Sequence, residues 1–345
     1  MKIDLRDGAG GRKMNEFISE VVLSTFGPST VGDIGLAQLD DGASFDNYII
    51  TTDGHTVKPL FFRGGNVGTL AACGTINDVS VMGARPLLLT SSLIIQAGFE
   101  RDDLVRILEA MKASCDEVEA QIVAGDTKVV EDPIGLYATT TGVGRRWKGL
   151  DDNIETVRAA RDYPSSFITD SGLEPGDVII ASGTIGDHGV SILSERDELS
   201  ISGDLSSDVA PVWGVVRAAL EAGGVTAMKD PTRGGIAGAL NEMASKAGCG
   251  MIIREHDIPV KPPVRAASEI LGINPFEVAN EGKVVMAVMP ERADRVLRAI
   301  HATTRGADAA VIGRATDDEK VLLETEIGAQ RLFDMPESDP VPRVC

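Results

Sequence analysis

The chain has 345 residues, of which 43% are hydrophobic and 25% charged, and a formal net charge of −19 at pH 7. This length exceeds the size at which a single hydrophobic core usually stops growing, so we expect two domains. The acidic excess argues against nucleic acids and anionic membranes as partners. No apolar stretch is long enough to cross a bilayer, and the N-terminus lacks the features of a secretion signal, so we expect a cytoplasmic protein.

The predicted elements alternate along the chain. Helical periodicity predicts helices over residues 14–26, 66–82, 101–119, 234–247 and 291–303. Short β-rich runs predict strands over residues 48–52, 87–95, 136–143, 177–181, 284–288 and 309–312. This alternation predicts an α/β or α+β fold.

A charged segment with glycines, prolines and weak periodicity, residues 145–176, is predicted to hold the domain boundary. The predicted units are an N-terminal domain over residues 1–150, a C-terminal domain over residues 171–330 and a mobile tail over residues 331–345.

Five short aspartate motifs have small neighbours, and several follow a predicted strand. They are Asp40-Asp41-Gly42-Ala43, Thr51-Thr52-Asp53-Gly54, Ile76-Asn77-Asp78, Gly125-Asp126-Thr127 and Lys229-Asp230-Pro231-Thr232. The loops that follow strands commonly bind ligands in α/β folds, and Mg²⁺ prefers carboxylate and phosphate oxygens. One such aspartate is more often a turn former or a helix cap. Five of them favour a shared metal and phosphate site.

Three glycine-rich segments precede predicted helices. They are Gly8-Ala9-Gly10-Gly11, Gly64-Gly65-Asn66 and Thr232-Arg233-Gly234-Gly235. Each is predicted to present free backbone N–H groups to a phosphate, although a tight connection is the ordinary alternative. The chain has no GxxxxGK[ST] motif and no GxGxxG motif after a strand, which argues against a P-loop or a dinucleotide-binding fold.

Three further polar residues are candidates for chemistry. Lys128 is able to neutralise phosphate charge, and a semi-buried Glu281 is able to act as a base, with a loop salt bridge and a helix cap as the structural alternatives. His188 is a lone histidine in Gly186-Asp187-His188-Gly189, and a structural role is the more common one.

The four cysteines divide into two kinds. Cys73, Cys115 and Cys249 lie in apolar surroundings and are predicted to be small buried hydrophobes. Cys345 follows Pro340 and Pro342, which favour an extended arm able to carry a thiol into a pocket. A frayed terminus is the alternative.

Together with Pro342-Arg343-Val344-Cys345, these motifs make the chain similar, nearly end to end, to the HypE family of carbamoyl dehydratases in hydrogenase maturation. That family belongs to a superfamily with aminoimidazole ribonucleotide synthetase, selenophosphate synthetase and thiamine-monophosphate kinase. The resemblance implies a two-domain PurM-like ATP-binding fold. It also implies a homodimer in which two N-terminal domains form a β-barrel, a C-terminal α/β sandwich and a flexible tail.

The resemblance further implies that ATP and Mg²⁺ bind in a cleft. The residues implied for the nucleotide and metal are Asp40, Asp41, Asp53, Asp78, Asp126, Asp230, Gly10, Gly11 and Gly234. Among these, Asp40, Asp78 and Asp230 are assigned to the metal, with the full division of the aspartates between metal and nucleotide left open.

The implied reaction is the ATP-dependent dehydration of a carbamoyl group carried on Cys345 to a thiocyanate. Glu281 is implied as the base, and Lys128 as the group that orients the carbamoyl group or offsets phosphate charge. The implied partners are the carbamoyltransferase HypF and the iron-scaffold proteins HypC and HypD, which receive the cyanide ligand for a [NiFe]-hydrogenase.

Three alternatives stay open. A selenophosphate synthetase uses a cysteine or selenocysteine near its N-terminus, and no cysteine precedes Cys73 here. A thiamine-monophosphate kinase would share the aspartate motifs without needing Cys345. A non-catalytic ATP-binding scaffold would use the tail only to dock a partner.

Overall fold

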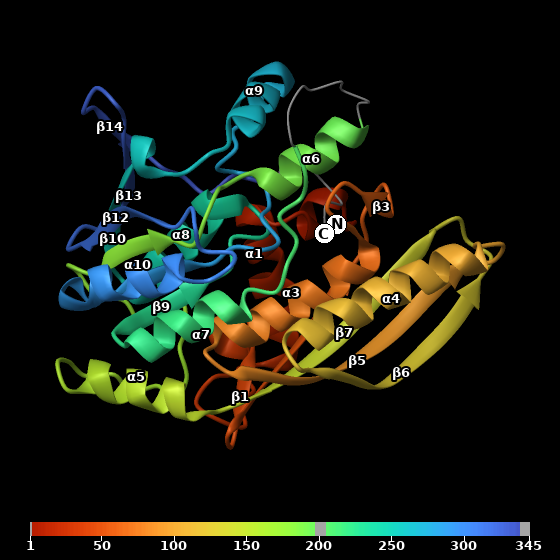
Figure 1. The fold of residues 1–345 in the computed structure, drawn as a ribbon, viewed down its shortest axis with the longest axis horizontal. Coiled ribbons are helices and arrows are strands. Elements are labelled where there is room, and N and C mark those ends of the chain that lie inside the picture. The colour runs from red at the N-terminus through yellow and green to blue at the C-terminus, as the bar shows by residue number, and fades with distance from the viewer. Residues whose placement is uncertain (1, 197–204, 339–345) are drawn as a thin grey trace.

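The computed structural model describes residues 2–196 and 205–338. Within these ranges the chain folds into two lobes, each built on one main sheet with helices packed on it (Figure 1). None of the described helices is long and apolar enough to span a membrane.

The sheet of the N-terminal lobe has five strands among the described residues. Their order is β1 (Ala43–Phe45), β2 (Tyr48–His55), β7 (Leu136–Arg145), β5 (Arg85–Gln96) and β6 (Gln121–Val130). All neighbours pair antiparallel except β5 and β6, which are parallel and are joined by helix α4 (Arg101–Glu117). Helices α3 (Val67–Val81) and α4 lie across the same side of this sheet (Figure 1).

Among the described residues only one face of this sheet is covered. Along β7 every second residue is buried, because alternate side chains of a strand point to opposite faces. On the uncovered face Ile50, Leu87 and Ile94 are exposed, and along β6 every residue but the last is exposed. The N-terminal lobe therefore has an open sheet face and an unpaired edge strand.

The sheet of the C-terminal lobe has seven strands in the described part of the chain. Their order is β14 (Gln330–Leu332), β13 (Val321–Glu324), β10 (Gly250–Arg254), β12 (Ala310–Thr316), β8 (Val178–Ala181), β11 (Val285–Val288) and β9 (Val225–Lys229). Both faces are covered, since Ile179 and Ile180 of β8 are both fully buried but belong to different core clusters.

The helices of the C-terminal lobe are divided between these two faces. Helix α8 (Gly235–Ala247) contributes to one cluster, and α5 (Lys148–Arg158), α7 (Trp213–Ala222) and α10 (Ala293–His301) contribute to the other. Helices α6 (Asp187–Arg196) and α9 (Pro262–Leu271) pack against each other. A two-stranded sheet, β3 (Phe61–Phe62) and β4 (Gly65–Asn66), leads into α3.

The two lobes share one hydrophobic core. The cluster that contains α7 and α10 also contains α3 and the buried residues of the N-terminal sheet. The segment 145–176, predicted to be a weakly structured boundary, lies in this core. It forms α5, whose Leu150, Ile154 and Val157 are buried, and continues through buried Phe167. Charged residues between these apolar positions hid an amphipathic helix in the sequence.

The predicted helices and strands are otherwise found close to their predicted places. The helical run near the N-terminus consists of α1 (Gly11–Phe17), a π-helical stretch (Ile18–Leu23) and α2 (Ser24–Phe26). The elements that were not predicted are strands β1, β3, β4, β6, β9, β10, β13 and β14 and helices α5, α6, α7 and α9.

The first residues of the predicted tail pack on the C-terminal lobe. Residues 330–332 pair with β13, and Phe333 is buried against the ring of Phe276 at 5.8 Å. The predicted bounds of the domains and the mobility of the tail stay predictions. Cys345 lies outside the described residues.

Candidate active site

A cleft with a volume of about 880 Å³ lies between the two lobes. One wall comes from α1, the loop 29–45, β2 and α3, and the other from the residues after β9, from α8 and from Glu281. One part of the lining is apolar and includes Met14, Ile18, Leu36, Leu39, Phe45 and Ile50. The other part holds a dense group of carboxyl groups.

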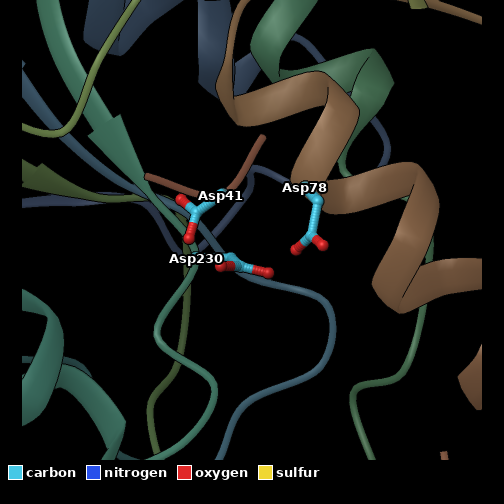
Figure 2. A group of neighbouring side chains, drawn as sticks. All are labelled: Asp41, Asp78 and Asp230. Atoms are coloured by element: carbon cyan, nitrogen blue, oxygen red, sulfur yellow. The ribbon is translucent and has the colours of Figure 1, made fainter. Parts of the chain in front are cut away.

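Three of these carboxyl groups converge from separate elements. Asp41 precedes β1, Asp78 lies near the end of α3, and Asp230 directly follows β9. One oxygen from each lies within 4.8 Å of the others, and Figure 2 shows the three side chains around a common space. Thr51 Oγ1 donates a hydrogen bond of 2.9 Å to Asp78 Oδ2.

Burial and nearby negative charge raise the pKa of two members of this group, Asp78 and Asp230. Burial, followed by the charges of Asp230, Asp53 and Asp41, raises the pKa of Asp78 well above its ordinary value. Burial and then the charge of Asp41 raise the pKa of Asp230 to about 8. Asp41 Oδ2 is buried and has no hydrogen-bond partner among the described residues. A divalent cation would offset the repulsion between these carboxyl groups and would give Asp41 Oδ2 a partner. The group therefore fits a Mg²⁺ site.

The grouping differs from the predicted metal set in one residue. Asp41 joins Asp78 and Asp230, whereas Asp40 turns aside to accept a hydrogen bond of 3.2 Å from the backbone N–H of Asp170. Burial, followed by the charges of Asp170 and Asp41, raises the pKa of Asp40 to about 7. Asp40 lines the same cleft, but its role as a metal ligand stays a prediction.

Lys229 is the buried cation beside the carboxyl groups. Its Nζ lies 2.8 Å from Asp41 Oδ1, 3.3 Å from Asp170 Oδ2 and 3.4 Å from Glu242 Oε2. Burial alone would lower the pKa of Lys229, but these carboxylates, Asp41 and Glu242 first, raise it well above the ordinary value. Lys246 adds a second cation, 2.5 Å from Asp170 Oδ2.

Asp53 also lines the cleft, next to His55. His55 Nε2 lies 3.0 Å from Asp53 Oδ2. Burial by itself would raise the pKa of Asp53, but the charge and hydrogen bond of His55, with further help from Arg233, lower it to about 2. The surroundings of Asp53 thus favour its charged form.

Glu281 lies at the floor of the cleft with a free carboxyl oxygen. The residue is buried, and Oε1 has no hydrogen-bond partner in the described chain. Burial, followed by the charges of Asp230 and Asp208, raises the pKa of Glu281 well above its ordinary value. A high pKa makes its carboxylate a stronger base.

The backbone of Glu281 is held from two sides. Its N–H donates to Asp208 Oδ1 at 3.1 Å, and its carbonyl accepts a 3.0 Å hydrogen bond from Asn77 Nδ2. The neighbouring Lys283 forms an ion pair of 2.9 Å with Asp208. Asn77 precedes Asp78 on α3, so the helix that carries Asp78 and the Glu281 loop are tied together.

The glycine-rich helix starts do not present the free N–H groups that the sequence predicted. At α1 the N–H groups of Arg12 and Lys13 donate to the carbonyls of Pro336 and Glu337, each at 3.2 Å. At α3 the side chain of Asn66 accepts from the next two N–H groups of the helix. At α8 the N–H of Ala237 donates to Phe276.

The chain itself therefore satisfies most of these donors, as buried helix ends require. Gly10 and Gly11 line the cleft, and Gly234 lies directly after the lining residue Arg233, but binding of nucleotide at the three glycines stays a prediction.

Two predicted residues lie away from the cleft of their own chain. Asp126 and Lys128 are on the edge strand β6, where they pair with each other and their side chains are 60% and 63% exposed. Neither lines the cleft.

His188 and the inner cysteines have structural surroundings. His188 is fully buried, with Nδ1 2.7 Å from Ser207 Oγ, which agrees with the structural interpretation. Cys73, Cys115 and Cys249 are free and buried, as predicted.

Sequence reasoning missed Asp170, Lys246, Glu242 and the clamp formed by Asn77. Arg233, which lines the cleft, appeared only as part of a glycine-rich segment. Asp170 and Lys246 lie in no motif, so the sequence carried no signal for them. Asn77 stood beside a predicted ligand, and burial of a polar residue within an apolar helical run was the available clue.

Comparison with known proteins places both lobes. The N-terminal domain model of AIR synthase related proteins matches residues 39–146, and the C-terminal domain model matches residues 174–325. The carbamoyl dehydratase HypE of Rhizobium leguminosarum bv. viciae is 43% identical over 354 residues, which cover 100% of this chain and 95% of that protein.

Two solved structures are similar over most of the chain. A structure described as a HypE–HypF complex has a TM-score of 0.84 at 38% identity and covers 92% of this chain and 99% of that one. A structure of the hydrogenase maturation protein HypE in complex with ATP has a TM-score of 0.79 at 35% identity and covers 100% of both chains.

Proposed function

The chain belongs to the HypE family of carbamoyl dehydratases, and from this premise we propose that it uses ATP to dehydrate a carbamoyl group on Cys345 to a thiocyanate. The thiocyanate would supply the cyanide ligand of iron during [NiFe]-hydrogenase maturation. The observation that carries the proposal is Glu281, a buried carboxyl with an unpaired oxygen in a cleft that also holds three convergent aspartates.

The cleft is suited to ATP in both size and lining. Its volume of about 880 Å³ lies within the range of small-molecule sites. The apolar part of the lining offers a surface for adenine, and the carboxylate part lies where the triphosphate would meet a cation. Lys229 and Arg233 are cations in the lining that can face phosphate charge.

Asp41, Asp78 and Asp230 would hold Mg²⁺. Bound there, Mg²⁺ would neutralise charge on the phosphates during transfer. Burial is the first cause of the raised pKa of Glu281 and the charge of Asp230 the second, and Mg²⁺ bound to Asp230 would offset that charge and make Glu281 easier to ionise beside the substrate.

The proposed reaction conserves every atom. The oxygen of the S-carbamoyl group attacks the γ-phosphorus of ATP, and the bond from that phosphorus to ADP breaks. Glu281 removes protons from the carbamoyl nitrogen while the C–O bond breaks, so that the oxygen leaves as part of inorganic phosphate. The products are the thiocyanate on Cys345, ADP, phosphate and a proton.

The first prediction tests Glu281 as the base. Glu281→Gln keeps the size of the side chain but removes the basic oxygen, so we expect the carbamoylated protein to accumulate in the presence of Mg-ATP. Intact-protein mass spectrometry of the Cys345 peptide after incubation with HypF and its carbamoyl donor would detect this. Wild-type protein should lose one water on addition of Mg-ATP.

Glu326→Gln, on an exposed turn, is the matched control and should behave as wild type. Normal water loss in Glu281→Gln would remove Glu281 from the base role. A wild-type Cys345 that never gains the carbamoyl mass would contradict the proposed function itself.

We further propose a homodimer in which the N-terminal sheets join into a barrel. The open sheet face, with exposed Ile50, Leu87 and Ile94, and the unpaired edge of β6 support this arrangement, because such surfaces are usually covered in a stable protein. Lys128 lies on β6, outside its own cleft. A catalytic Lys128 would therefore act in the cleft of the partner subunit.

The second prediction tests this exchange of residues between subunits. Lys128→Ala and Glu281→Gln homodimers should each be inactive, but an equal mixture of refolded or co-expressed chains should recover about a quarter of wild-type activity. Half of the dimers are then mixed, and each mixed dimer has one cleft with both groups intact. A mixture as inactive as its parents would place Lys128 in its own cleft or outside the reaction.

The proposed partners follow from the family. We propose that HypF loads the carbamoyl group, in keeping with the solved HypE–HypF complex of a relative, and that HypC and HypD receive the cyano group.

A further inference from the structure

Residues 336–337, near the described end of the chain, are hydrogen-bonded to the first residues of α1, which follow the turn at Gly10 and Gly11. Arg12 N–H donates to the Pro336 carbonyl and Lys13 N–H to the Glu337 carbonyl, each at 3.2 Å. Lys13 Nζ also forms an ion pair of 3.2 Å with Glu337. These contacts join two segments from opposite ends of the sequence at the rim of the cleft, which Gly10 and Gly11 line.

Residues 333–335 also contact the C-terminal lobe and α1. Phe333 is buried, and its ring packs edge-on against Phe276 at 5.8 Å. Asn241 of α8 donates a 2.6 Å hydrogen bond to the Phe333 carbonyl, and Asn15 of α1 contacts Met335 Sδ at 3.7 Å. The path from residue 333 to residue 337 is thus determined on both sides.

The two glycines of the turn are required by this contact. Both have a left-handed backbone, with φ of 77° at Gly10 and 75° at Gly11, which favours glycine. A Cβ on Gly10 would lie 2.6 Å from Arg233 Cβ, and a Cβ on Gly11 would collide with the Pro336 carbonyl oxygen. The absent side chains therefore make room for chain, not for a ligand.

We propose that Gly10 and Gly11 are positioning residues whose turn holds residues 335–337 at the rim of the cleft, as the fixed root of the arm that carries Cys345. This inference rests on the proposed carrier role of Cys345. Cys345 follows Ser338 by seven residues, so an extended chain would reach about 25 Å from the root. Fixing residues 335–337 limits the volume that the Cys345 thiol can reach, and the cleft lies inside that volume.

Hydrogen–deuterium exchange of the full-length protein tests the root directly. In wild type we expect slow exchange in the peptides that cover residues 10–17 and 330–338. Gly11→Ala should speed exchange in both peptides. The matched control is Gly98→Ala, which also has a left-handed backbone, with φ of 86°, but has open space around its Cβ position, and exchange in the two peptides should not change.

A second variant keeps the test decisive if Gly11→Ala does not fold. Asn241→Ala removes the hydrogen bond to the Phe333 carbonyl without altering the turn, and it should speed exchange in residues 330–338. Unchanged exchange in both variants would overturn the proposal.

A non-hydrolysable ATP analogue distinguishes a turn that holds residues 335–337 from a turn that binds phosphate. Residues 330–338 should stay protected with the analogue bound, and their release by it would make the turn a phosphate site instead.

A kinetic readout separates positioning from folding. In carbamoylated Gly11→Ala and Asn241→Ala proteins we expect water loss at Cys345 to slow by about tenfold or more. In Asn241→Ala, whose substituted residue does not line the cleft, we expect ATP affinity to be unchanged. An unchanged rate despite faster exchange would refute the positioning role. Failure of wild type to lose water would refute the proposed function, while the exchange results would still decide whether the root is fixed.

Discussion

At the scale of single residues, the cleft is organised by unequal proton affinities. His55 lowers the pKa of Asp53. Burial and the charges of neighbouring aspartates raise the pKa values of Asp78, Asp230 and Glu281. Such separation of carboxyl pKa values within one cleft is typical of sites that bind cations and move protons. Because neighbouring negative charges raise these pKa values, a bound cation would change the protonation of the site.

The third prediction concerns the pH dependence of Mg²⁺ binding. Asp230, with a pKa of about 8, holds a proton at lower pH, and this proton must leave before Mg²⁺ can bind. We therefore expect Mg²⁺ affinity to rise with pH and to level off above about 8, changing by up to about tenfold per pH unit below that value for one released proton.

Isothermal titration calorimetry in buffers of different ionisation enthalpy would measure both the affinity and the proton release. Asp78→Asn should weaken binding at every pH, and Asp102→Asn, on the exposed start of α4, should not. An affinity that is constant between pH 6.5 and pH 9 would contradict the assignment of these carboxyls to the cation.

At the scale of elements, α5 shows how a segment that resembles a linker becomes part of the core. Its charged residues face outward, and Leu150, Ile154 and Val157 are buried against the lobe. Asn153 pins the helix further, because its side chain both donates to and accepts from the backbone of Val225 at the start of β9. The helix therefore positions the strand that ends at Asp230.

The fourth prediction tests α5 as a core element. Ile154→Ala leaves a cavity in a fully packed site, so the free energy of unfolding should fall by about 2–4 kcal/mol. Denaturant unfolding would measure the change, with exposed Glu155→Ala as the control expected to stay within about 0.5 kcal/mol of wild type. Equal effects in the two variants would show that α5 is not packed as described.

At the scale of the whole molecule, the cleft also joins the lobes. Lys229, from the end of β9, pairs with Asp41 of the N-terminal lobe and with Asp170 and Glu242 of the C-terminal side. The continuous core that runs through α3 and α7 supports the same arrangement. The cleft residues of both lobes are therefore held in one arrangement.

The fifth prediction tests this buried ion network. Lys229→Met removes the cation that pairs with Asp41 and Glu242, while Asp170 keeps Lys246, so the free energy of unfolding at neutral pH should fall by about 3 kcal/mol or more. Lys148→Met breaks a pair at the exposed surface and should have an effect of about 0–1 kcal/mol in the same denaturation assay. A Lys229→Met protein as stable as wild type would mean that protons already neutralise these carboxyl groups.

Local patterns in the sequence predicted several of the helices and pointed to the aspartates of the cleft. The periodicity of α4 can be read without knowledge of its packing partners, and an aspartate that follows a strand is placed where α/β folds commonly bind ligands. The family resemblance added the nucleotide, the metal and the carrier cysteine. The short strand β9 was missed because its fully buried run carries no alternation.

The tertiary structure alone decided how these residues meet. In the folded chain Asp41, and not Asp40, lies beside Asp78 and Asp230, and Lys128 lies on an exposed edge strand. The tertiary structure also filled the glycine-rich helix starts with the chain's own carbonyls and side chains. The physical reason is that burial, charge pairing and the satisfaction of backbone donors depend on neighbours distant in sequence. The sequence names the groups, and packing determines which of them share a charge, a proton or a hydrogen bond.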